Sequence, residues 1–422
     1  MILEILVIGN EIRSGALVDS NAAYIARKLK EKGIEVARHS AIGNDPADII
    51  NIINILKEIS QRSNVAVVMC GLSSIGEDLK VADAAKAEDV SESIDTQALV
   101  SMKNFFKVQN RPLTHSNKKK AMLPSSDARC LGNSISEAPG FHFKIGQCDF
   151  FFLPGVPSEM RQMLTEQVIP RIMEIQETTM DDRLIKTFST LGLTESAMGD
   201  HVDDFNQQFP QIKLSFCANF PGIQVNLYAR KIDKGNVRVQ MEAAIQWIYR
   251  KLGNNMISDT GEAIEKVVGD LLGRKQAHLA VAESCTGGLI ADLLTNVPGS
   301  SNYFVFSAVT YSNQLKMKIL GVTARTLDRY GAVSEQTAKE MAHGVQQISG
   351  TTYGLSVSGI AGPGGATDDK PVGTVCIGLA SDDFVRAHRF CYKFNDRWMN
   401  KRIFATTALD LLRRELLGIP RL

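Results

Sequence analysis

Short apolar runs alternate with amphipathic stretches over the first 170 residues. Three of these runs predict buried strands, at residues 2–8, 35–42 and 65–69. Two stretches of helical period lie between them, at residues 20–32 and 46–62. This alternation indicates a parallel α/β sheet, whose ligands bind beyond the carboxyl ends of the strands. We therefore expect one α/β domain over residues 1–170.

The pattern changes in residues 171–252, which predict a small α+β domain. Strands are expected at residues 184–189, 213–216 and 224–230, and helices at residues 195–205 and 236–252. The order βαββα resembles a KH-like module, but the Gly-x-x-Gly clamp with which such modules bind RNA is missing. We expect this domain to act as a spacer. The polar, glycine-containing residues 253–261 predict a linker.

The last part of the chain, residues 262–422, again mixes buried runs with helical stretches. Strands are expected at residues 278–282, 303–309 and 355–357. Helices are expected at residues 289–295 and 400–416, and a further helix that has residue 316 in its first turn is expected to run to residue 320. The sequence therefore predicts a second α/β domain at the carboxyl end.

Composition and charge narrow the class of protein. A chain of 422 residues is too long for one ordinary core, so two or three domains are expected. The 47 basic residues nearly balance the 46 acidic ones, so we expect no nucleic-acid partner. Seven cysteines without a C-x-x-C pair indicate a reducing compartment. No secretory signal and no 18-residue apolar run is found, so we expect a cytoplasmic protein without a membrane partner.

A serine stands in the turn between the strand predicted at 278–282 and the helix predicted at 289–295. Ser284 is followed by Thr286, Gly287 and Gly288. N–H groups at the start of a helix can bind a phosphate or stabilise an oxyanion, and the sequence does not decide between these two. The alternative is an ordinary helix cap with glycines for tight packing.

A lysine and a tyrosine follow the strand predicted at 303–309. Ser312 or Asn313 is a suitable N-cap, so Lys316 falls in the first turn of the next helix. The positive end of a helix disfavours a cation there, and so it lowers the pKa of the lysine. A neutral lysine can act as general base for a serine hydroxyl, and the Tyr311 phenol can relay or donate a proton. The alternatives are a solvated lysine and a core tyrosine.

A glycine-rich loop follows the strand predicted at 355–357. Four glycines in seven residues, 359–365, suit a close approach of the backbone to a phosphate or ribose, although a surface turn has the same composition. Arg397 and Arg402 lie further along the chain. Both can pair with a substrate phosphate through two hydrogen bonds, or they can form ordinary ion pairs on a helix surface.

These blocks together resemble the C-terminal domain of the CinA (competence/damage-inducible) family, a nicotinamide-nucleotide amidase of the PncC type. The similarity rests on six blocks in family order, at residues 282–288, 297–301, 311–316, 331–334, 359–365 and 370–374. It implies hydrolysis of nicotinamide mononucleotide to nicotinate mononucleotide and ammonia, in pyridine-nucleotide salvage. Ser284 would be the nucleophile and Lys316 its general base, with Tyr311 assisting. The resemblance also implies a homodimer and a reaction that needs no cofactor or metal.

The blocks and their chemistry give a set of expected substrate-binding residues. They are Glu283, Thr286, Gly287, Gly288, Asn313, Ser358, Gly359, Gly362, Gly364, Arg397 and Arg402. Ser358 stands where the family commonly has threonine, and either hydroxyl can orient the amide.

The N-terminal part resembles the other CinA domain, which is similar to molybdopterin-binding folds. The blocks at residues 17–24, 138–141 and 153–160 carry this similarity, which implies a metal-dependent pyrophosphatase for ADP-ribose-like nucleotides. The sequence departs from the family where a metal would bind. Asn10 replaces an aspartate, two glycines are missing from residues 70–80, and Lys80 replaces a hydroxyl. Glu77 and Asp78 remain as candidate ligands of a divalent metal, and we expect an altered site.

The sequence therefore predicts a nicotinamide mononucleotide amidohydrolase with a Ser-Lys mechanism. One alternative is the N-terminal pyrophosphatase, which would need a divalent metal. Another is a non-catalytic nucleotide-binding protein in competence or the damage response. An ammonia assay with and without a chelator separates the three.

Overall fold

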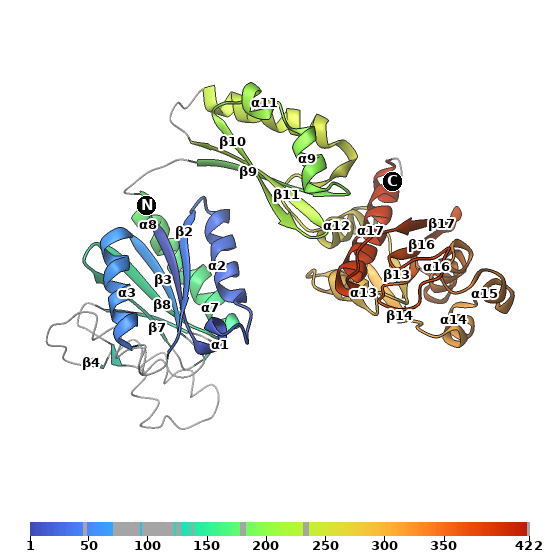
Figure 1. The fold of residues 1–422 in the computed structure, drawn as a ribbon, viewed down its shortest axis with the longest axis horizontal. Helices are drawn as coiled ribbons and strands as arrows, with labels where there is room; N and C mark the ends of the chain where they lie inside the picture. Colours follow the sequence, from blue (N-terminus) through green and yellow to red (C-terminus); the bar gives the residue numbers. More distant parts are fainter. Residues whose placement is uncertain are drawn as a thin grey trace. The chain divides into compact units, whose positions relative to one another are not determined.

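The structure is a computed structural model that describes most of the chain. The described residues are 1–44, 49–70, 93–94, 122–123, 128–133, 135–136, 139–177, 183–230 and 236–419. They divide into two compact units, residues 1–182 and residues 183–422, which we describe one at a time (Figure 1). No helix in these described ranges is both long and apolar enough to cross a membrane.

The first unit is built on a six-stranded sheet of order β2-β1-β3-β8-β7-β6. Its strands are β1 (Leu3–Ile8), β2 (Val36–Ile42), β3 (Val65–Cys70), β6 (Arg129–Leu131), β7 (Gly140–Ile145) and β8 (Cys148–Pro154). The neighbours β2, β1, β3 and β8 run parallel, as the alternating pattern predicts. Strand β7 pairs antiparallel with β8, and β6 pairs antiparallel with β7. A separate short ladder joins β4 (Ser93–Ile94) to β5 (Met122–Leu123).

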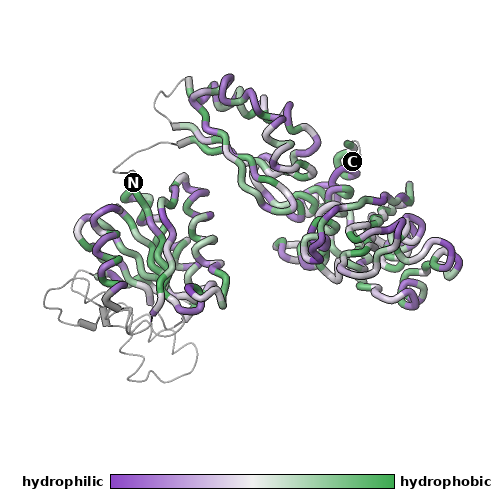
Figure 2. Tube along the Cα trace, in the orientation of Figure 1, coloured by the Kyte–Doolittle hydropathy of each residue, from purple (hydrophilic) through white to green (hydrophobic). Residues whose placement is uncertain are grey.

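Helices cover both faces of this sheet and give three layers (Figure 1). They are α1 (Asn10–Arg13), α2 (Ser20–Glu31), α3 (Ile49–Arg62), α7 (Pro157–Met163), the π-helix Leu164–Val168 and α8 (Ile169–Glu177). Alternate residues of β1 point to opposite faces. Leu3, Ile5 and Val7 therefore pack with α2, α7 and α8, while Leu6 and Ile8 pack with α3. The central strands of the sheet are correspondingly hydrophobic in Figure 2.

The second unit begins with a four-stranded sheet of order β10-β11-β9-β12, which we call the middle module (residues 183–258). Its elements are β9 (Arg183–Leu191), α9 (Glu195–His201), α10 (Phe205–Gln208), β10 (Ile212–Asn219), β11 (Gly222–Arg230), α11 (Asn236–Leu252) and β12 (Met256–Ser258). The predicted order of strands and helices is present, but the helix expected over 195–205 is broken in two. Part of the expected linker forms β12, which pairs with β9.

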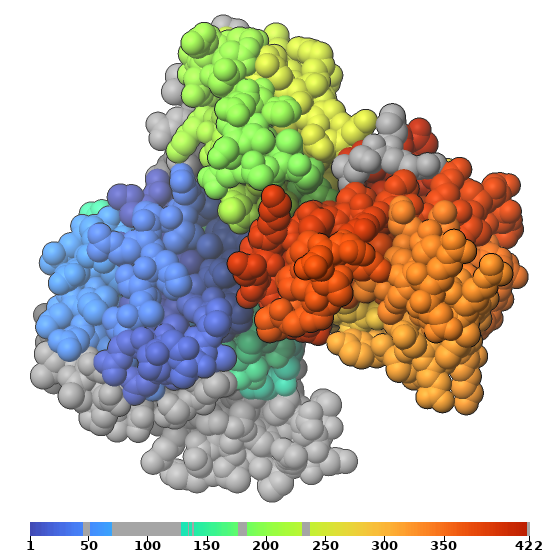
Figure 3. Space-filling view, turned by 45° about the vertical axis from the view of Figure 1, so that its right-hand side comes forward, coloured from blue at the N-terminus to red at the C-terminus, as the bar shows by residue number. Residues whose placement is uncertain are grey.

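The C-terminal domain (residues 262–419) contains a five-stranded sheet of order β14-β13-β15-β16-β17. Its strands are β13 (Leu279–Glu283), β14 (Phe304–Val309), β15 (Tyr353–Gly359), β16 (Thr374–Ser381) and β17 (Phe384–Cys391). Its helices are α12 (Ile264–Lys275), α13 (Leu289–Thr295), α14 (Asn313–Leu320), α15 (Ala324–Tyr330), α16 (Glu335–Ser349) and α17 (Arg397–Leu417). Figure 3 shows the surface of this domain in orange and red.

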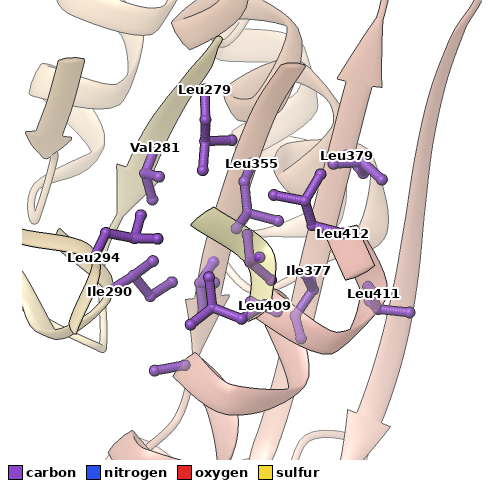
Figure 4. Packing of buried hydrophobic residues seen from close by; sticks show 14 of the residues in the cluster. Leu279, Val281, Ile290, Leu294, Leu355, Ile377, Leu379, Leu409, Leu411 and Leu412 are labelled. Carbon is purple, nitrogen blue, oxygen red and sulfur yellow. The ribbon is translucent and has the colours of Figure 1, made fainter. Parts of the chain in front are cut away.

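The core of the C-terminal domain lies mainly between its sheet and the helices α12, α13 and α17. Leu279 and Val281 of β13 pack there against Leu409 and Leu412 of α17 (Figure 4). The strands β14, β13 and β15 are parallel, and Glu283 of β13 is in register with Val309 and Val357. The carboxyl ends of these three strands therefore meet at one edge of the sheet. The predicted chemical residues follow these three ends.

Candidate active site

The serine turn has the conformation that its glycines permit. Strand β13 ends at Glu283, and helix α13 begins at Leu289. Gly287 and Gly288 between them have φ values of 62° and 93°, a left-handed region that residues with a Cβ rarely adopt. The N–H of Gly287 donates to the carbonyl oxygen of Ser284 at 3.1 Å. This tight turn holds Ser284 at the carboxyl end of the strand, as the sequence predicts.

Lys316 reaches this serine from the neighbouring strand end. Its Nζ lies 3.1 Å from Ser284 Oγ, 2.7 Å from the Thr310 carbonyl oxygen and 3.4 Å from the Tyr311 carbonyl oxygen. Helix α14 begins after Ser312, whose hydroxyl accepts the N–H of Leu315. That cap places Lys316 in the first turn, where its side chain points back toward the strand ends. The structure therefore brings the predicted nucleophile and base into contact.

The surroundings of Lys316 favour its neutral form. Its side chain is 1% exposed, and it forms no ion pair with a carboxylate in the described part of the chain. Burial lowers the pKa of the Lys316 amine, because a charged group loses its hydration there. A neutral amine can accept the hydroxyl proton of Ser284, while the two carbonyl oxygens hold its N–H groups. This geometry suits an activated serine nucleophile.

Glu283 accepts hydrogen bonds from backbone N–H groups, whereas the sequence predicts that it binds the substrate. Its fully buried carboxylate accepts the N–H groups of Gly288 at 3.0 Å, Ile290 at 3.2 Å and Ala291 at 2.9 Å. A carboxylate at the start of a helix satisfies N–H groups that have no partner within the helix. The N-terminus of α13 is therefore filled by the protein's own side chain, and the N–H of Gly288 is not available to a phosphate or an oxyanion.

Thr286 lies within the same turn and is fully buried. Its hydroxyl oxygen is among the buried polar atoms for which the described residues offer no hydrogen-bond partner.

Arg397 connects two of the predicted blocks. Its Nη1 donates to the carbonyl oxygen of Gly362 at 2.6 Å, and its Nη2 donates to the Tyr311 hydroxyl at 3.3 Å. The Tyr311 side chain is 63% exposed. The described hydrogen bonds place its hydroxyl beside Arg397 and its backbone carbonyl beside Lys316. Tyr311 thus links Lys316, the predicted base, to the first turn of α17.

The other predicted residues of the glycine-rich region serve mainly the fold. Ser358 is buried, and its hydroxyl donates to the carbonyl oxygen of Ala332 at 2.7 Å. A Cβ on Gly359 would lie 2.7 Å from the carbonyl oxygen of Thr374, so glycine permits the close approach of β16. Gly364, in contrast, has open space around it, and exposed Asn313 begins α14.

Two residues that the sequence reasoning missed lie on α17. Lys401 places its Nζ 3.5 Å from the position that a Cβ on Gly287 would occupy, so this cation lies beside the serine turn. Asn400 is fully buried and donates through Nδ2 to the carbonyl oxygens of Ala361 at 3.1 Å and Phe394 at 2.9 Å. The signal for Lys401 was its spacing of four residues from Arg397, which puts both on one helix face.

Three cations therefore gather on the first turns of α17. Arg397 and Lys401 face the site, and the Arg402 guanidinium lies 5.2 Å from the centre of the Trp398 ring. None of the three forms an ion pair with a carboxylate of the described residues. Cations without protein counter-charges are suited to bind an anionic group of a ligand.

The carboxyl ends of β1, β3 and β8 meet at one edge of the N-terminal sheet. Ile8 of β1 is in register with Cys70 of β3, which is in register with Pro154 of β8. Asn10 exchanges hydrogen bonds of 3.3 Å with the backbone and side chain of Asn44. Its amide oxygen is thereby used within the fold.

The candidate metal ligands Glu77 and Asp78, and Lys80 with them, lie outside the described residues. Within the described ranges, no three His, Cys, Asp or Glu side chains gather as a metal site.

Two protein-family models match the chain. One is described as "CinA C-terminal domain" and matches residues 261–416, and the other is described as "Probable molybdopterin binding domain" and matches residues 4–174. A CinA-like protein from Desulfosudis oleivorans is 46% identical over 99% of this chain and 100% of the relative. A CinA-like protein from Desulforapulum autotrophicum is 42% identical over 99% of both chains.

Solved structures resemble a part of the chain. The competence/damage inducible protein CihA from Agrobacterium tumefaciens is 37% identical, and the match covers 36% of this chain and 94% of that chain, with a TM-score of 0.34.

Proposed function

Because the chain belongs to the CinA family, we propose that it hydrolyses nicotinamide mononucleotide to nicotinate mononucleotide and ammonia. One observation carries this proposal: the buried amine of Lys316 lies 3.1 Å from Ser284 Oγ, at the meeting point of three strand ends. A buried lysine beside a serine is costly for stability, and the pair is an arrangement that can hydrolyse an amide without a histidine base. The proposed reaction needs no cofactor.

The reaction proceeds through an acyl-enzyme. Neutral Lys316 takes the proton of Ser284 as Oγ attacks the carboxamide carbon and the carbonyl oxygen becomes an oxyanion. The ammonium group of Lys316 then protonates the departing nitrogen, and ammonia leaves as the carbonyl reforms. A water molecule gives its proton to Lys316 and attacks the ester carbon. The proton returns to Ser284 Oγ, and nicotinate mononucleotide is released.

The cations of α17 support a nucleotide as substrate. Arg397 and Lys401 lie near the serine turn, and the N-terminus of α13 is already occupied by Glu283. We therefore assign the 5′-phosphate to Arg397, Lys401 and Arg402 and not to the helix N-terminus. Since the Tyr311 hydroxyl contacts Arg397, we assign Tyr311 to substrate positioning in place of the expected proton transfer.

The test is ammonia release from nicotinamide mononucleotide by the full chain. Ser284→Ala and Lys316→Met each lower kcat by at least about a hundredfold, because either change removes the activated nucleophile. The matched controls Ser301→Ala and Lys318→Met alter exposed residues of the same domain and keep full activity. Full ammonia release by Ser284→Ala would show that the nucleophile assignment is wrong. Ammonia release that persists in the presence of a chelator favours the amidase over the alternative metal-dependent chemistry.

We also propose that two copies of the chain pair through the outer side of β14 and α14. Strand β14 is an edge strand of its sheet. Apolar side chains there are exposed, namely Val305, Val309, Leu315, Met317 and Ile319. An edge strand beside a row of exposed apolar side chains is a surface that a second copy can cover. Sedimentation of the wild type as a dimer and of Val305→Glu as a monomer tests this. A wild-type monomer would overturn it.

A further inference from the structure

The middle module touches α17 through the tip of its β10–β11 hairpin. Asn219 and Gly222 are the last paired residues, so Phe220 and Pro221 form the tip. The Phe220 ring lies 5.4 Å from the Phe394 ring in an edge-to-face arrangement and 6.1 Å from the Trp398 ring in a stacked one. Phe220 packs against the core of the C-terminal domain and is not part of the middle module's own core.

A second contact holds the other end of the same helix. The backbone carbonyl oxygen of Asn254 accepts Nη2 of Arg413 at 3.1 Å and Nη2 of Arg414 at 3.3 Å. From Trp398 to Arg414 the helix rises by about 24 Å. The middle module thus contacts α17 near its start and near its end, which a mere spacer would not do.

The contact at the start of α17 reaches the cations of the site. Trp398 contacts the Phe220 ring, and the Arg402 guanidinium lies 5.2 Å from the centre of the Trp398 ring. The indole is 59% exposed, so few other groups fix its orientation. Arg397, adjacent in sequence, contacts Gly362 and Tyr311. Phe220 therefore adds a contact from another module to this first turn.

We propose that Phe220 is a positioning residue that orients the first turn of α17 for binding of the substrate phosphate. This inference rests on the proposed amidase function and adds the middle module to its substrate site. Phe220 acts through Trp398 and Arg402 and does not touch the reacting atoms. Loss of its ring would leave the Ser284 and Lys316 pair unchanged and would weaken the grip on the phosphate.

Kinetics of full-length Phe220→Ala test the proposal. We expect the KM for nicotinamide mononucleotide to rise about fivefold, while kcat stays within about twofold of the wild-type value. Loss of one aromatic contact weakens binding by about this factor. The KM for nicotinamide riboside, which has no phosphate, stays unchanged. Phe220→Tyr retains the ring and restores the wild-type KM. The control Phe209→Leu alters an aromatic of the middle module core and leaves the KM unchanged.

A fluorescence readout separates failure of this inference from failure of the proposed function. The chain has two tryptophans, so Trp247→Phe leaves Trp398 as the sole indole emitter. In that background Phe220→Ala shifts the Trp398 emission whether or not the chain has amidase activity. A wild type without ammonia release would reject the amidase, and the emission shift would still report the contact. An active wild type whose KM and emission are both unaffected by Phe220→Ala would overturn the positioning role.

Discussion

The most informative single residue is Lys316. Burial of a charged amine destabilises the folded protein, and this cost is lower when the amine is neutral. The sequence placed it in the first turn of a helix, and that prediction is confirmed. Its contact with Ser284 was inferred from family order and is present at 3.1 Å. The burial of Lys316 could not be predicted from the sequence. The neighbouring residues of α14 are exposed, and the Lys316 side chain is covered by parts of the chain that only folding brings together.

The rate of the proposed reaction should rise with pH through the lowered pKa of Lys316. Burial lowers that pKa below the usual value, so the amine becomes neutral and able to act as base at a lower pH than a free lysine would. The pH profile of kcat/KM for nicotinamide mononucleotide therefore has its rising limb below about pH 10.4. A profile whose rising limb lies at or above about pH 10.4 would contradict the assignment of Lys316 as a base with a lowered pKa.

The same residue makes stability depend on pH. The unfolded chain binds the lysine proton up to about pH 10.4, whereas the folded chain releases it at lower pH. Stability therefore rises with pH between these two pKa values. Urea midpoints of the wild type should increase relative to those of Lys316→Met from pH 7 to pH 9.5. Exposed Lys318→Met should follow the wild type at both pH values, and parallel behaviour of all three proteins would contradict the buried titration.

At the scale of elements, the parallel strands were easier to predict than the strands β16 and β17 and the first residue of helix α17. The parallel strands β1, β3, β13 and β15 were found from short apolar runs. Strands β16 and β17 were not predicted. All eight residues of β16 are buried, and a continuous apolar run does not by itself distinguish a strand from a buried helix. Helix α17 begins at Arg397, three residues earlier than predicted, so the shared face of Arg397 and Lys401 was missed.

The first turn of helix α13 leads to a prediction about Glu283, because the Glu283 carboxylate holds the serine turn through the N–H groups of this helix. Glu283→Gln removes the charge and replaces one acceptor oxygen with an NH₂ group that cannot accept the helix N–H groups. We expect stability to fall by about 2 kcal/mol and kcat to fall at least about tenfold, with KM nearly unchanged. Asp292→Asn, an exposed change in the same helix, serves as control. An equal loss in KM would indicate direct contact with substrate.

At the scale of the molecule, the predicted CinA relationship and the α/β fold with a molybdopterin-binding-like N-terminal domain are confirmed. The domain boundaries at residues 170, 252 and 261 stay predictions. The boundary between the two compact units of the structure falls between residues 182 and 183. Sequence reasoning treated the middle module as a spacer because its composition carries no chemical motif. Its contacts depend on Phe220 and on a backbone carbonyl at Asn254, and neither feature has a sequence signature.

The buried ion cluster of α17 should make the middle module and the C-terminal domain unfold together. Asp410 is 1% exposed and accepts Nε of Arg413 and Nε of Arg414, each at 2.7 Å, while both arginines also donate to Asn254. Asp410→Asn removes the carboxylate that accepts Nε of Arg413 and Nε of Arg414, which costs about 3–5 kcal/mol. The control Glu415→Gln alters a half-exposed pair with Arg386 and should cost less than about 1 kcal/mol.

Single-tryptophan variants measure this coupling, because one indole lies in each part. Trp247 is in the core of the middle module, and Trp398 is on α17. Their urea transitions should coincide in the wild-type background, since the arginines hold both parts through one carbonyl oxygen. In Asp410→Asn the Trp398 transition should move to lower urea and separate from that of Trp247. Separate transitions already in the wild-type background would mean that the middle module is docked too weakly to position the substrate site.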